Sequence, residues 1–118
     1  MSILAELNKH LSELNIPVET GVFTGKAPDE YIIITPLGDI FEIYADNKPI
    51  FETQEARLSL FSKSNYLERK NQIAKILLAA DFIITNRLYI GHEDTTGYHH
   101  YSIDISKEYY SILKNDEL

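Results

Sequence analysis

Two stretches of the chain alternate between apolar and polar residues, and this alternation constrains the fold more than any other feature. They cover residues 56–61 and 100–105. Successive side chains of a β-strand point to opposite faces, so a period of two predicts strands with one buried and one open face. Such strands need a covering layer on the buried face. The side chains that we expect to be buried are Ala56, Leu58, Leu60, Tyr101, Ile103 and Ile105.

Two helices are predicted as that covering layer. In residues 2–14, leucines recur at a spacing of three or four, with Ser2 as the N-cap. In residues 65–80, Asn65 and Glu68 have the spacing of a capping box. The leucine stripe of the first helix either covers the sheet or docks a partner. The second helix is expected to bury Leu67, Ile73, Ala74, Ile76, Leu77 and Ala80.

Shorter apolar runs predict additional strands. Residues 31–35, YIIIT, are apolar on both faces and predict a central buried strand that ends at Pro36. Residues 18–23 predict a short strand. Residues 82–85 predict another, followed by a turn at residues 86–87 before the next strand begins.

A long hairpin is predicted over residues 39–61. DIFEIYA alternates, DNKP makes the turn, and the return strand is polar on both faces before it becomes amphipathic. This change of pattern indicates an arm, residues 44–55, that projects beyond the core. Ile50 and Phe51 near its tip either form an exposed apolar contact or fold back onto the sheet.

The C-terminal hairpin, residues 82–106, carries three of the four histidines near its tip. EDTTG fits a hairpin loop with Gly97 at a positive φ angle. Because His99 and His100 are adjacent in a strand, they point to opposite faces and cannot chelate one ion together, and His92 can approach only one of them. Zinc sites of histidine and carboxylate usually draw three ligands. We therefore predict no metal site and no cofactor.

No catalytic motif is present in the sequence. There is no G-x-S-x-G, no glycine-rich phosphate loop and no cysteine nucleophile. The paired carboxylates Asp29 and Glu30 sit in a predicted turn, where solvation explains them. We predict that the chain is not an enzyme.

Length and charge narrow the class of protein further. The 118 residues suit one domain, 1–118, and the net charge is −7 with scattered lysine and arginine. Sequence-specific nucleic-acid readers carry basic clusters, so we expect neither such binding nor attachment to anionic membranes. No apolar run approaches the roughly 20 residues of a membrane span, and the N-terminus lacks the pattern of a signal peptide. The absence of cysteine fits a reducing compartment.

A set of short motifs carries a resemblance to a known group of proteins. A predicted strand ends in LFSK, a helix opens on NYLERKNQI, and DFIIT, YIGHEDTTGYHHY and IDISKEY follow. Over residues 28–110 the chain resembles small phage and prophage proteins of Gram-positive bacteria that are encoded between the head-connector and major tail genes. These are the tail terminator, or tail completion, proteins and related neck proteins. No catalytic signature accompanies the resemblance.

The resemblance implies a structural role in virion assembly. Such proteins are similar to one another in an α+β fold and commonly form rings, often hexamers, that cap the finished tail tube and face the head. We accordingly expect a mixed, mostly antiparallel sheet with a long projecting hairpin and two main helices packed on it. The expected partners are further copies in a ring, the tail tube protein and a head-completion or connector protein. The expected location is the virion, assembled in the cytoplasm of a bacterial host.

Candidate interface residues come from the arm and from the hairpin tip. Tyrosine is abundant there, and it suits an interface as well as a hairpin that needs no partner. Three alternatives stay open: another neck or head-completion protein, an acidic inhibitor-type binding module, and a metal hydrolase centred on His92 with His99 or His100. The candidate interface residues are Tyr44, Asp46, Lys48, Ile50 and Phe51 on the arm, and His92, Asp94 and Tyr98 at the tip.

Overall fold

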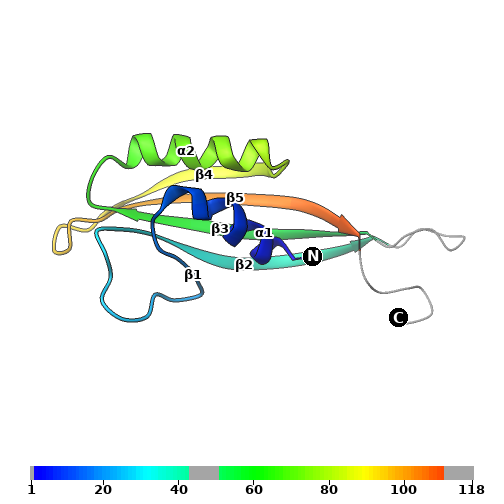
Figure 1. The fold of residues 1–118 in the computed structure, drawn as a ribbon, viewed down its shortest axis with the longest axis horizontal. Coiled ribbons are helices and arrows are strands. Elements are labelled where there is room, and N and C mark those ends of the chain that lie inside the picture. Colours follow the sequence, from blue (N-terminus) through cyan, green and yellow to red (C-terminus); the bar gives the residue numbers. More distant parts are fainter. Residues whose placement is uncertain (1, 43–50, 111–118) are drawn as a thin grey trace, which may run out of the picture.

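The computed structural model describes residues 2–42 and 51–110 (Figure 1). Two helices pack on a five-stranded, mixed and mostly antiparallel sheet, so the predicted α+β class is confirmed. The elements are α1 (Ile3–Leu11), a 3₁₀ turn η1 (Ser12–Leu14), β1 (Val18–Thr20), β2 (Glu30–Glu42), β3 (Phe51–Ser62), α2 (Tyr66–Ala79), β4 (Ile83–His92) and β5 (His99–Tyr110).

The strands lie in the order β1-β2-β3-β5-β4. The short β1 runs parallel to β2, and every other neighbouring pair is antiparallel. The longest uninterrupted register joins β3 to β5, from Phe51 opposite Tyr110 to Ser62 opposite His99. The two alternating stretches of the sequence therefore lie side by side at the centre of the sheet.

The prediction that Pro36 ends a strand was wrong. β2 continues through Pro36 to Glu42 with a shift of register between Pro36 and Gly38. Proline has no backbone N–H to give to a ladder, so it is tolerated at an edge or a bulge. Both conditions hold here, because β1 ends at Thr20, opposite Ile34, and leaves the outer side of Pro36 without a partner strand among the described residues.

The predicted turn at residues 86–87 was also wrong. β4 runs without a break from Ile83 to His92 along β5. Its register shifts between Ile84 and Asn86 and again between Tyr89 and Gly91. Each shift places one extra residue in β4. Such a β-bulge lets a strand whose residues have a low propensity for β-structure stay paired with its neighbour.

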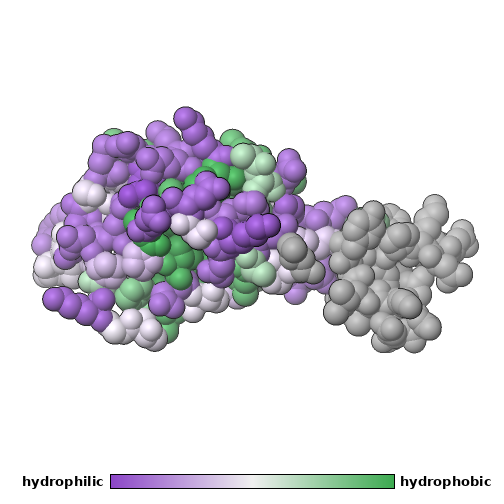
Figure 2. Space-filling model, in the orientation of Figure 1, coloured by the Kyte–Doolittle hydropathy of each residue, from purple (hydrophilic) through white to green (hydrophobic). Residues whose placement is uncertain are grey.

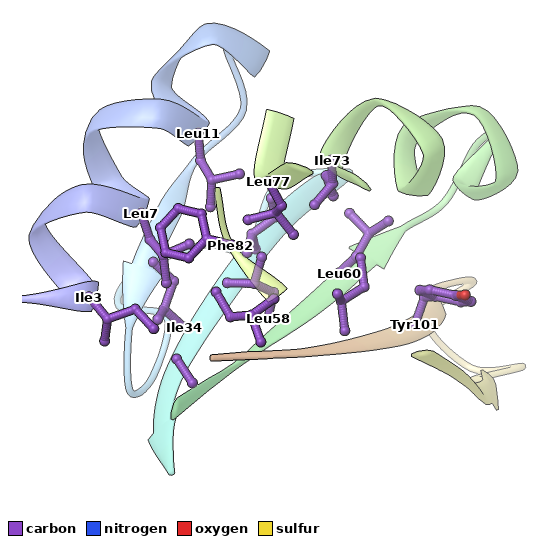
Figure 3. Packing of buried hydrophobic residues seen from close by; sticks show 14 of the residues in the cluster. Ile3, Leu7, Leu11, Ile34, Leu58, Leu60, Ile73, Leu77, Phe82 and Tyr101 are labelled. Carbon is purple, nitrogen blue, oxygen red and sulfur yellow. The ribbon is translucent and has the colours of Figure 1, made fainter. Parts of the chain in front are cut away.

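The hydrophobic core lies between the two helices and one face of the sheet (Figure 3). The alternation correctly predicted the buried face of β3 and β5, and the leucine stripe of α1 covers the sheet. The largest fully buried side chains of the core include Leu7, Leu11, Ile32, Ile34, Leu58, Leu60, Ile73, Leu77, Ile103 and Ile105.

Ile73, Ala74 and Leu77 of the predicted stripe on α2 are buried and Ile76 and Ala80 are partly buried, but one residue of the stripe is exposed. Leu67 is 53% exposed. Tyr66 packs on the sheet at this end instead, with its ring centroid 4.8 Å from that of His99 and 6.3 Å from that of Tyr101. Tyr66, the residue before Leu67 in the same helical turn, thus makes the contact with the sheet that the helical period predicted for Leu67.

Both predicted helix N-caps are present. The Ser2 hydroxyl accepts a hydrogen bond from the backbone N–H of Ala5 at 3.2 Å, and Asn65 Oδ1 accepts one from Glu68 N–H at 3.2 Å. The Glu68 carboxylate lies 3.5 Å from the Asn65 side-chain amide. The 3₁₀ turn η1, which follows α1, ends where Asn15 adopts a left-handed φ of 56°. The four leading N–H groups of a helix need such partners, so these contacts fix where each helix begins.

A set of polar contacts holds α1 to the base of the arm. The backbone N–H of Ile3 donates a buried hydrogen bond to Gln54 Oε1 at 2.8 Å. Glu6 accepts one from the Tyr109 hydroxyl at 2.8 Å and pairs with Lys107 at 3.0 Å. Burial raises the pKa of Glu6, but the bonds from Tyr109 and Lys107 outweigh it and the net pKa is lowered. The ionised carboxylate therefore holds α1 against β5.

The described part of the arm, residues 51–55, lies in β3 between β2 and β5. β5 pairs with β3 as far as the first residue of β3. Thr53 lies opposite Glu108, and Glu52 lies opposite Tyr109. β2, β3 and β5 extend beyond the end of the helices in Figure 1. No helix in the described residues has the length and apolar character that a membrane crossing requires.

Leu77→Ala should lower the free energy of unfolding by about 2–5 kcal/mol, because it removes a fully buried side chain and leaves a cavity. Leu78→Ala is the matched control, since Leu78 is 60% exposed and its truncation should change stability by less than about 0.5 kcal/mol. Urea unfolding followed by circular dichroism measures both. Equal losses in the two variants would contradict this packing of α2.

Candidate functional site

The arm residues predicted as contacts lie mostly outside the described part of the chain. Tyr44, Asp46, Lys48 and Ile50 fall within residues 43–50. Phe51 opens β3 and is half-buried, with Glu42 opposite it on one side and Tyr110 on the other. The described strands therefore carry the chain to the two ends of this segment and hold those ends side by side.

The arm and the β4–β5 hairpin tip lie at opposite ends of the sheet (Figure 1). β5 begins at His99 beside the hairpin loop and ends at Tyr110 beside the arm. Backbone hydrogen bonds from Glu93 N–H to Tyr98 O and from Gly97 N–H to Glu93 O close the loop, and Gly97 has a φ of 82°, as predicted. The arm and the hairpin tip are thus two separate ends of the described sheet.

His92 and Asp94 are both exposed at the tip. His92 Nδ1 lies 3.1 Å from Asp94 Oδ1, and the Asp94 side chain is 96% exposed. Tyr98, the third predicted contact at the tip, lies in the interior at 7% exposure. Its hydroxyl donates to the carbonyl of Pro28, and its ring packs against Tyr31. Tyr98 therefore ties the loop to the rest of the fold.

The histidines divide between the two faces of the sheet, as the period of two predicted. His92 is the strand partner of His99, with ring centroids 4.6 Å apart, while His100 lies across from Phe61 at 4.3 Å. Within the described residues, no group of three or more histidine, cysteine, aspartate or glutamate side chains has an arrangement that would hold a metal ion.

The face of the sheet opposite the helices carries an aromatic cluster at its hairpin end. Tyr31 stacks on Phe61 at 4.9 Å, and Phe23 lies 4.9 Å from Tyr31. His100 Nε2 is buried in this cluster and makes no hydrogen bond to any described residue. Burial lowers the pKa of His100, because a charged imidazolium loses solvation there.

The middle of the same face is polar and has small side chains. Arg57 makes a bidentate pair with Asp104, with Nε 2.7 Å from one carboxylate oxygen and the terminal nitrogen 3.0 Å from the other. Ser59 and Ser102 are strand partners beside this pair. The charges of Arg57 and Asp104 balance one another, and the two described helices pack on the other face of the sheet.

The outer edge of β4 is the most apolar exposed part of the sheet. Ile83 is 62% exposed, Leu88 54% and Ile90 52%. Sequence reasoning found these residues to be strand-forming but did not show that their strand lies at an edge, because strand order has no local signal. Figure 2 shows one face of the molecule, whose described residues are mostly hydrophilic with apolar groups in limited patches.

Comparison with known proteins adds no family to this description. No protein-family model matches the chain, and no curated protein matches it.

His100→Phe should make the protein less sensitive to acid. Because the folded state favours the neutral imidazole, His100 contributes stability above pH of about 6.5 that is lost as the pH falls toward its lowered folded-state pKa. Phenylalanine keeps the stacking on Phe61 and removes the unpaired Nε2, so stability at pH 7 should rise by about 1 kcal/mol. Thermal unfolding between pH 5 and pH 8 measures the change.

The control for this variant is His92→Gln at the exposed tip. It should unfold at the wild-type temperature across the same pH range apart from a small effect of losing the Asp94 contact. A His100→Phe protein with the same pH dependence as the wild type would show that this imidazole does not contribute to acid sensitivity.

Proposed function

We propose that this chain is a structural protein of virion assembly, a tail terminator that caps the tail tube and forms part of the head–tail junction. The observation that carries the proposal is the arm: β2, β3 and β5 run together past the helices, and β2 ends and β3 begins side by side there, at Glu42 and Phe51. An arm of this kind is suited to reach a neighbouring molecule.

The element order supports the same assignment. The resemblance implies a sheet with two helices packed on it, and that architecture is present. The motifs that carry the resemblance occupy the end of β3, the second helix and the two C-terminal strands with their connecting loop. They include the hairpin loop whose backbone bonds join Glu93, Gly97 and Tyr98. Fold alone does not define function, so the shared motifs and the arm carry the argument.

The charge of the chain suits a protein through whose ring DNA passes. With a net charge of −7, a ring of several copies repels the DNA backbone and does not retain it. Lys63 and Lys107 stand over the aromatic rings of Tyr98 and Phe82, so part of the positive charge is already engaged within the fold.

In the mechanism that we propose, the arm contacts the last ring of the tail tube and blocks the addition of further tube subunits. Tyr44, Asp46, Lys48, Ile50 and Phe51 are the contact residues on the arm. The hairpin tip, with His92 and Asp94 exposed, lies at the other end of the sheet and faces the head.

Replacing residues 43–50 with Asn-Gly should abolish binding to tail tubes and leave the domain folded. Glu42 and Phe51 are direct strand partners, so a two-residue turn can join them without strain. Co-sedimentation with purified tail tubes of the phage or prophage that encodes the chain measures binding, and thermal unfolding checks the fold. A shortened protein that still sediments with the tubes would contradict the role of the arm.

The same experiment separates this function from its rivals. A terminator binds the end of a tube, whereas another neck protein binds the head connector and leaves the tubes bare. A metal hydrolase centred on His92 and His99 would instead show stoichiometric zinc after purification and a higher unfolding temperature with zinc. Failure of the intact protein to bind tubes would overturn the terminator assignment.

A further inference from the structure

β4 is ten residues long and eight of these residues are exposed. β5 pairs with one side of β4, and no described strand pairs with the other. The sequence of this strand, IITNRLYIGH, contains no proline, and Arg87 is its one permanent charge. Natural proteins usually protect such an edge with charges, proline, β-bulges or a covering segment, because its free N–H and C=O groups pair readily with another strand. Of these, β4 has Arg87 and its two bulges, and between the bulges residues 86–89 keep a regular register.

The opposite edge of the sheet is exposed in part. β1 covers Ile32 to Ile34 of β2, and from Thr35 onward no described strand lies on that side. Leu37 is 43% exposed and Ile40 54%. Asp39 lies between them, is exposed, and makes no ion pair within the described residues. Residues 37–40 of this edge therefore combine apolar side chains with one free negative charge.

The two edges complement one another in charge and strand direction. Arg87 makes no ion pair within the described residues either, so β4 offers a free cation where β2 offers a free carboxylate. Three successive antiparallel pairings separate β2 from β4, so the two strands run in opposite directions. Copies that keep the same orientation therefore bring β4 of one against β2 of the next in the antiparallel sense.

We propose that this chain associates with further copies of itself head to tail, with the outer edge of β4 in one copy pairing with the outer edge of β2, residues 37–40, in the next. The partner is thus a second copy of this chain, and the contact extends the sheet from one copy into the next. Such a heterologous contact closes into a ring when its rotation permits.

One register of β4 in one copy against β2 in the next gives favourable contacts on both faces of the extended sheet. Asp39 lies opposite Gln54 and Arg87 opposite Ile103, so both point to the helix side and pair directly when they are placed opposite one another. The same register sets Leu88 opposite Gly38 on the open face, where the missing side chain leaves room, and brings Ile40 beside it. The copies are then offset by about four residues, roughly 13 Å, a stagger that tilted strands in a closed sheet require.

Pairing of β4 with β4 in a two-fold dimer fits the observations less well. It would leave the β2 edge and the free carboxylate of Asp39 uncovered, and it would use no negative charge to offset Arg87. It would also stop at two copies, because an isologous contact uses the same surface on both partners.

Light scattering across a concentration series tests the proposal through a charge exchange. Arg87→Glu and Asp39→Arg, each alone, should raise the concentration at half association by about tenfold, because each places like charges in contact. The double variant, which restores opposite charges, should return to within about threefold of the wild type. Both positions are exposed, so thermal unfolding should show all three variants folded.

Two blocked variants then test the head-to-tail geometry. Leu88→Lys blocks the β4 edge and Ile40→Lys blocks the β2 edge, so each variant alone should be monomeric and an equal mixture should form a dimer that does not grow. A wild-type chain that stays monomeric at every concentration, or an Ile40→Lys variant that dimerises alone, would overturn the proposal. An Asp39→Arg variant that associates like the wild type would do so as well.

This inference rests on the proposed function only where the closed ring is concerned, and the two fail separately. Assembled rings that do not bind tail tubes would refute the terminator function and leave the edge contact intact. Self-association by light scattering that is unchanged by Arg87→Glu, Asp39→Arg and the blocking lysines, in a protein that binds tail tubes, would refute the edge contact and leave the function intact.

Discussion

The pairing of β3 with β5 is the constraint on which the rest of the structure depends. The two strands match residue for residue over twelve positions, from Phe51 with Tyr110 to Ser62 with His99. Because their register has no bulge, both strands keep the same two faces along their whole length. One face gathers the aliphatic core beneath α1 and α2, and the other holds the aromatic cluster and the pair of Arg57 with Asp104. A shift by one residue would exchange the faces and destroy both.

Local sequence patterns correctly predicted the features that depend on the residues of a single helix or strand. The period of two gave the buried faces of β3 and β5 and the separation of His99 from His100, and the cap residues placed both helix starts. The errors arose where a neighbouring strand determines the local conformation. Pro36 reads as a strand end, yet it is tolerated because β1 stops at Thr20, and residues 86–87 read as a turn, yet β5 keeps them paired.

The candidate site was predictable to the same limit. Sequence reasoning placed the arm and the hairpin tip but could not see that Tyr98 is buried, because its hydrogen bond goes to Pro28, seventy residues earlier in the chain. It also could not distinguish the edge of β4 from an interior strand. Ile83 and Leu88 are ordinary strand formers, and only the order of strands makes them exposed. The unpaired Nε2 of His100 likewise has no local signature.

The head-to-tail contact that we propose bears on how one small domain could meet two different partners. When β4 and β2 edges pair around a ring, the strands run from one rim of the ring to the other, and every copy keeps the same orientation. The arm and the hairpin tip lie at opposite ends of those strands. All arms then gather on one rim, and all tips, with His92 and Asp94, gather on the other. A heterologous ring is therefore polar by construction, whereas a two-fold dimer would place both kinds of end on both sides. A junction between a tail tube and a head needs that polarity, because its two sides bind different molecules.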